Sequence, residues 1–422
     1  MYKIFEKIKL LIKDGFFHIL IGNVLVKMVG FLSSIFIVRL ISKADYGYLA
    51  YADNLYQYIN LLSGLGLSTA ILKFCSPKRE KGENKFFLNK AITIGILFQL
   101  TASVLLVFTI CFREIPFPKA RKIIFVLILY PTITQIVTTI QSYIRAQLNN
   151  KLYAKIGVVQ TLAVFIASLP LAYIWGIYGV VYARYFAMIL VILIGIRFVK
   201  TDLPVSVVSS KVSAKEYRFF WKVSLSMMLA NMFSMIMPIN EMFLINNYIK
   251  DEIVSANYKV AILIPSQIVF LTSSVVVYLF PKLAQIADKL KDALKITVKV
   301  GTLLFGIIIA LCSIGYVISP LIIRVVYGER YIDAIRLSKV YWIVYGLNAG
   351  FRMLPMNVLP AIGSTLFNSF ISILSCIVHV CILRKLIISY GIYGAPYSLM
   401  IVYIISGCIY WFYLYIKCTN KN

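Results

Sequence analysis

The chain has 422 residues, of which 61% are hydrophobic and 14% are charged, and its formal net charge is +27. Soluble domains carry about 25% charged residues, so this composition excludes a large soluble helical protein. A strongly basic soluble protein would suggest a nucleic-acid partner. In a membrane protein, lysine and arginine collect in cytoplasmic loops, and we therefore expect no nucleic acid.

Apolar runs of membrane-spanning length repeat from end to end, for example at residues 156–175, 307–323 and 397–416. At about 1.5 Å per residue, roughly twenty residues cross the 30 Å hydrocarbon core of a bilayer. The pattern predicts an all-α integral membrane protein with about twelve transmembrane helices. The predicted spans are 16–38, 47–72, 88–112, 121–144, 153–175, 178–198, 220–247, 254–280, 296–322, 336–359, 365–387 and 392–416.

The longest connection, residues 200–217, is polar and falls near the middle of the chain. It predicts an N-terminal six-helix lobe at 1–199 and a C-terminal six-helix lobe at 218–422, joined by a cytoplasmic loop. The first two spans of each half are also linked by similar short charged turns. Two such lobes around a central cavity are typical of transporters, in which the substrate path runs between the halves.

Lysine and arginine are concentrated on one side of the predicted spans. They gather before the first span, after spans two, four and eight, and around the central loop, whereas the opposite side has far fewer. By the positive-inside rule, both termini are predicted to be cytoplasmic. The first apolar run is long and lacks a small-residue cleavage site, so we interpret it as an uncleaved span.

Several charged residues fall inside the predicted spans, where a charge at mid-bilayer costs at least about 2.5–3.5 kcal/mol. Such residues usually face a polar interior. Lys27, Arg352, Lys259 and Arg184 are the candidate cations of a substrate-binding cavity. Glu241 and Asp53 are candidates for ion coupling, because a buried carboxylate beside a cation can exchange a proton or a sodium ion.

Each of these residues could instead have a purely structural role. Asp53, Lys259 and Arg184 lie within about two turns of a predicted span end, where long side chains can reach the interface. Glu241 could simply neutralise one of the cations in a structural ion pair. Lys27, Glu241 and Arg352 lie deeper, which favours an interior role.

The chain lacks the motifs of several other classes. There is no P-loop for ATP, no HExxH or GxSxG motif, and no long extracytoplasmic loop for a catalytic site. The seven cysteines form no CxxC pair, and His18 and His379 are too few and too far apart in sequence to suggest a metal site. We therefore expect a transporter with no catalytic residues, no cofactor and no metal.

Four segments carry short motifs in a fixed order. They are residues 36–47, with Arg-Leu and an acidic-Tyr-Gly turn; 65–74, with Gly-Leu, Ala and Phe; Glu241 followed by 256–261 and 279–283; and 326–334. Together they resemble the polysaccharide-export flippases, the Wzx-type O-antigen or repeat-unit translocases of the multidrug/oligosaccharidyl-lipid/polysaccharide exporter (MOP) superfamily. One departure is Met242, where the family commonly has a basic residue; Lys259 or Lys27 could supply that cation.

The resemblance implies a MATE-like fold in the bacterial inner membrane. It also implies flipping of undecaprenyl-diphosphate-linked oligosaccharide repeat units to the periplasmic leaflet by alternating access, coupled to a cation gradient. The implied partners are this lipid-linked glycan, membrane lipid, the glycan polymerase and a chain-length regulator. A cation-coupled multidrug exporter is the first alternative, although it would favour acidic cavity residues. A membrane glycan polymerase is the second, and the missing long loop argues against it.

Overall fold

The structure is a computed structural model that describes residues 16–75, 80–199, 212–286 and 289–419. The N-terminal basic segment and most of the predicted central loop lie outside these residues. In the described part, the chain is helical and has no β-strand. It divides into two compact units, Met1–Met232 (the first unit) and Phe233–Asn422 (the second unit). The lobe boundaries predicted at 199 and 218 stay a prediction.

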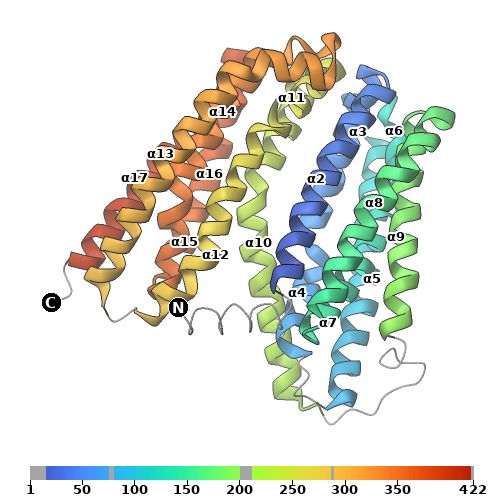
Figure 1. Ribbon diagram of the computed structural model, residues 1–422. Coiled ribbons are helices and arrows are strands. Elements are labelled where there is room, and N and C mark those ends of the chain that lie inside the picture. The colour runs from blue at the N-terminus through green and yellow to red at the C-terminus, as the bar shows by residue number, and fades with distance from the viewer. Residues whose placement is uncertain (1–15, 76–79, 200–211, 287–288, 420–422) are drawn as a thin grey trace. The chain divides into compact units, whose positions relative to one another are not determined.

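The first unit is built from helices that pack side by side (Figure 1). Helix α8 lies along both α2 and α9, while α4 and α5 pack against α7. Its elements are α2 (Phe16–Leu40), α3 (Lys43–Leu61), the short η1 (Ser63–Gly66), α4 (Leu67–Phe74), α5 (Lys81–Phe112), α6 (Ala120–Val126), α7 (Tyr130–Ala146), α8 (Asn150–Trp175), α9 (Ile177–Val199) and the first part of α10 (Ala214–Ile249).

The second unit begins within α10, and its helices α13, α14 and α17 pack on one another. Its further elements are α11 (Glu252–Leu263), η2 (Pro265–Ile268), α12 (Val269–Gln285), α13 (Leu290–Ile322), η3 (Ile323–Tyr327), η4 (Glu329–Tyr331), α14 (Ala334–Leu347), η5 (Asn348–Arg352), α15 (Met353–Ala361), α16 (Thr365–Tyr390), η6 (Gly391–Tyr393) and α17 (Gly394–Thr419).

The predicted all-α membrane fold is confirmed. Each predicted span falls on one helix or on a helix with a break in it. Among the described residues, seven helical stretches are long and apolar enough to cross a membrane, or eight if α6 and α7, bent by 40°, form one span. The count of twelve spans therefore stays a prediction. Breaks at Ser63–Gly66 and Pro265–Ile268 divide two of the predicted spans into shorter helices.

The break between α3 and α4 is a left-handed turn that needs glycine. Gly64, Leu65 and Gly66 have φ angles of 52°, 61° and 74°. A Cβ atom on Gly66 would lie 2.2 Å from the backbone oxygen of Ser224 in α10, whose hydroxyl donates to the Leu65 carbonyl at 2.5 Å. A left-handed backbone and a close approach therefore both exclude larger side chains at Gly66.

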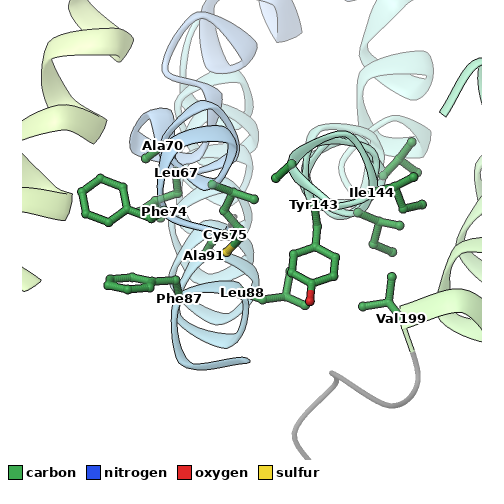
Figure 2. Close-up of a cluster of buried hydrophobic side chains, with 14 of the residues drawn as sticks. Leu67, Ala70, Phe74, Cys75, Phe87, Leu88, Ala91, Tyr143, Ile144 and Val199 are labelled. Carbon is green, nitrogen blue, oxygen red and sulfur yellow. The ribbon is translucent and has the colours of Figure 1, made fainter. Parts of the chain in front are cut away.

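The helix that follows this turn contributes to the core of the first unit, part of which Figure 2 shows. Leu67, Ala70 and Phe74 of α4 are buried against α5 and α7, and the Phe74 ring meets Phe87 with centroids 5.2 Å apart. Lipid chains are as apolar as these residues, so close van der Waals packing, more than burial from water, holds such helices together. This packing gives a structural reason for the glycine, alanine and phenylalanine of the 65–74 motif.

Candidate functional site

The first unit contains an ion pair between Arg184 of α9 and Asp53 of α3. Nη1 of Arg184 lies 2.7 Å from Oδ1 of Asp53, and Nη2 lies 3.0 Å from Oδ2. The two side chains are 20% and 21% exposed. Two parallel charge-assisted hydrogen bonds make this a strong, well-oriented pair. The sequence assigned Arg184 to the substrate and Asp53 to ion coupling, and the structure brings them together.

This pair lines a cavity of about 440 Å³, here called the first-unit cavity. One of its walls is α3, which contributes Asp53, Tyr56, Gln57 and Asn60. These positions are spaced i, i+3, i+4 and i+7, which places them on one face of a helix. A polar stripe at helical spacing within an apolar span is the sequence signal for this wall, and only Asp53 was selected from it.

The remaining walls come from α7, α8 and α9. Tyr130 is the first residue of α7, just after the bend from α6, and its ring centroid lies 5.9 Å from the guanidinium carbon of Arg184. Gln160 of α8 accepts a hydrogen bond through Oε1 from Gln141 at 3.1 Å. The cavity thus combines one ion pair with amide and hydroxyl groups.

In the second unit, Glu241 of α10 is buried among polar side chains, here called the Glu241 cluster. Its Oε2 accepts hydrogen bonds from the hydroxyls of Tyr258 at 2.8 Å and Tyr341 at 3.4 Å. Its Oε1 lies 3.7 Å from Nε2 of His379, and the two side chains are 1% and 0% exposed. The hydroxyl of Ser398 lies 3.2 Å from the same imidazole nitrogen.

Within the described residues, two polar atoms of the Glu241 cluster lack a hydrogen-bond partner. Oε1 of Glu241 and Nδ1 of His379 are both buried without a hydrogen-bond partner in the described part of the chain. A buried polar atom without a partner costs about 1–3 kcal/mol, so Oε1 is the atom of this cluster that a bound cation would satisfy. In the described residues, no group of three or more His, Cys, Asp or Glu side chains could bind a metal ion.

Sequence reasoning missed His379 and the role of Tyr258. His379 was considered only as a metal ligand, although an ionisable side chain in the middle of an apolar span is itself a signal of function. Tyr258 lies in the 256–261 segment that follows Glu241 in the third motif. A direct hydrogen bond between Tyr258 and Glu241 explains why the two occur together.

Arg352 belongs to the same unit and is 6% exposed. It donates from Nε to the hydroxyl of Ser406 at 2.9 Å and from Nη1 to Oδ1 of Asn348 at 3.2 Å. Its guanidinium carbon lies 5.0 Å from the ring centroid of Tyr403. Two of the predicted residues, Glu241 and Arg352, are therefore buried in the second unit with polar partners.

The other two predicted cations occupy less enclosed positions. Lys27 is exposed on α2 and is not among the residues that line the first-unit cavity. Lys259 is half-buried on α11, directly after Tyr258. Of the four cations predicted for one cavity, Arg184 is the one that lines the first-unit cavity in the described residues. The shared cationic cavity stays a prediction.

Residues 12–287 match the family described as "Polysaccharide biosynthesis protein". This chain belongs to that family, as the resemblance of its motifs predicted. It is 24% identical over 242 residues to a Shigella flexneri protein named "Putative O-antigen transporter". The match covers 56% of each chain, so it spans little more than half the length of that relative.

Two solved structures of low sequence identity share the fold. An inward-facing MATE multidrug resistance transporter of the MOP superfamily is 12% identical, with a TM-score of 0.74 over 94% of this chain and 95% of its own. The lipid II flippase MurJ, in an inward closed conformation, is 17% identical, with a TM-score of 0.74 over 94% and 86%. The predicted MATE-like fold is thereby confirmed.

Proposed function

We propose that this protein is a flippase that moves undecaprenyl-diphosphate-linked oligosaccharide repeat units from the cytoplasmic to the periplasmic leaflet of the bacterial inner membrane. The observation that carries the proposal is the first-unit cavity, which holds a carboxylate–guanidinium pair and three amide side chains besides apolar lining residues. Ionisable groups inside membrane-spanning segments often mark substrate or ion pathways. Membership in a polysaccharide biosynthesis family supports a glycan as the cargo.

The substrate has three parts that need different surroundings. The glycan needs hydrogen-bonding groups, the diphosphate needs cations, and the lipid tail can stay in the bilayer. Arg352, Lys259 and Lys27 are our candidates to offset the diphosphate charge, because a cation acts more strongly at low dielectric than in water. Alternating access of the two lobes would then move the headgroup across without any covalent chemistry.

The Glu241 cluster is our candidate for energy coupling. A cation that binds Glu241 in one state and leaves in the other would drive the cycle. Hard metal cations prefer sets of oxygen ligands, whereas Glu241 faces an imidazole nitrogen and hydroxyl groups that donate to it. This chemistry favours a proton over a sodium ion.

Deletion of the gene in its own host, followed by analysis of lipid-linked intermediates, tests the proposal. We expect loss of surface polysaccharide, with single repeat units retained on the cytoplasmic leaflet and restored export on complementation. Surface-exposed single units without polymer would instead indicate a polymerase. Unchanged glycan with new drug sensitivity would indicate a multidrug exporter. Either result would overturn the proposal that this protein is a flippase.

A further inference from the structure

We infer that the first-unit cavity is a subsite for an uncharged sugar of the glycan and does not bind the diphosphate or an acidic sugar. This inference rests on the proposed function and names the part of the substrate that the cavity recognises. It differs from the role that the sequence alone suggested for Arg184, which was to bind the anionic diphosphate.

The charge balance of the cavity carries the first step. Its charged lining residues are Asp53 and Arg184, which neutralise each other through two hydrogen bonds of 2.7 and 3.0 Å. An incoming phosphate or carboxylate could take the bidentate face of Arg184 only by displacing Asp53, which would leave that carboxylate unpaired in a partly buried site. At the remaining N–H donors it would still lie beside the like charge of Asp53. Breaking such a pair is strongly unfavourable, so the cavity selects against anions.

A cationic ligand is disfavoured for the corresponding reason. Both oxygens of Asp53 are already engaged by Arg184, and the cavity lining holds no second acidic residue in the described part of the chain. A cationic drug that approached Asp53 would lie beside the positive guanidinium of Arg184 and be repelled by it. The cavity is therefore suited to a neutral, polar ligand.

The hydrogen-bonding groups of the cavity match sugar hydroxyls. Gln57, Asn60 and Gln160 line it, and each amide side chain carries both a donor and an acceptor group. A guanidinium has five N–H donors, and two of those of Arg184 point to Asp53, so others remain for a ligand. A hydroxyl can donate to one of these groups while it accepts from another, as a pyranose with adjacent hydroxyls requires.

The size of the cavity agrees with a small part of the glycan. Its volume of about 440 Å³ lies in the lower part of the range of about 300–1,000 Å³ that small-molecule sites occupy. The remaining lining residues are Tyr56, Tyr130, Val164 and Met188. Tyr56 is held in place by a 2.6 Å hydrogen bond from its hydroxyl to the carbonyl of Ile124.

Saturation-transfer NMR on the full-length protein in nanodiscs tests this inference without any transport step. The probes are methyl hexopyranosides, the corresponding methyl hexuronides and inorganic pyrophosphate as a mimic of the diphosphate. We expect saturation transfer to neutral hexosides, and we expect pyrophosphate to leave it unchanged. Gln57→Leu should lower the signal about threefold or more because a hydrogen-bonding pair is lost. The matched control Gln267→Leu, at an exposed position on η2 of the second unit, should not lower it.

The variant Asp53→Asn separates the two possible roles of Arg184. Without the neutralising carboxylate, Arg184 becomes available to anions, and we expect binding to shift from hexosides toward hexuronides. Strong binding of hexuronide or pyrophosphate by the wild type, or equal signals from Gln57→Leu and wild type, would overturn the inference. Those results would leave the flippase itself intact if lipid-linked units still accumulate in the deletion strain, so the two proposals fail separately.

Discussion

At the scale of the residue, the Glu241 cluster places a carboxylate and an imidazole side by side, away from solvent. If protons drive transport through this pair, Glu241→Gln should abolish the response to a pH gradient and slow flipping roughly tenfold or more, since a hydrogen bond to a charged group is worth about 1.5–3 kcal/mol. Flipping in proteoliposomes under an imposed pH or sodium gradient measures this. The control is Glu329→Gln, whose side chain is 72% exposed. A pH-gradient response retained in Glu241→Gln, or a wild-type response to sodium alone, would contradict the prediction.

Arg352 provides a second prediction at this scale. Arg352→Ala removes the N–H donors of the hydrogen bonds that Ser406 and Asn348 accept, and leaving buried partners unpaired costs about 1–3 kcal/mol. We expect a lower melting temperature together with reduced glycan export, while the protein still reaches the membrane. Export assays with quantitative membrane blots check both effects. Arg336→Ala, at an exposed position of α14, should change neither, and normal export in Arg352→Ala would remove Arg352 from the substrate path.

At the scale of the element, the turn between α3 and α4 depends on Gly66. Gly66→Ala should destabilise the first unit by more than the roughly 1–2 kcal/mol of a left-handed residue, because the new Cβ would also clash with the Ser224 backbone. Thermal unfolding in detergent and the yield of folded protein measure this. Gly306→Ala, on α13 with no atom near the added Cβ, is the matched control. Equal melting temperatures for the two variants would show that the turn can rearrange.

The helices were predictable from sequence to a much greater extent than their breaks. Apolar runs locate α8, α13 and α17, because lipid requires about twenty apolar residues whatever the neighbours are. The left-handed turn at Gly66 was not predicted, because its reason lies in α10, far away in sequence. The breaks therefore depend on tertiary contacts that no local pattern records.

The candidate site divides in the same way. The charges themselves were found from their burial cost, and the polar face of α3 could have been found from its helical spacing. Their pairing could not be found from the sequence, because Arg184 lies 131 residues from Asp53 and His379 contacts Glu241 from another helix. Sequence therefore identified most of the ionisable residues and missed which of them neutralise one another.

At the scale of the whole molecule, the predicted orientation can be tested by cysteine labelling. The positive-inside rule places the 200–217 loop in the cytoplasm and the stretch near Lys119 in the periplasm. In a background without the exposed Cys111, Cys381 and Cys408, Lys215→Cys should resist a membrane-impermeant maleimide in intact cells. Lys119→Cys should react with it. Both positions are exposed, and the reverse pattern of labelling would invert the topology.

The neutral Asp53–Arg184 pair has a consequence for the kinetics of loading. A cavity with excess charge attracts an oppositely charged ligand from a distance, and the association rate then falls steeply with ionic strength. A balanced pair exerts little such long-range pull, and ions in solution screen a partly buried pair only weakly. The rate at which the first-unit cavity takes up its sugar should therefore hardly change as salt is added. Contacts between the diphosphate and the cations that bind it elsewhere would weaken over the same range of ionic strength. The salt dependence of binding would therefore distinguish recognition of the glycan from recognition of the diphosphate.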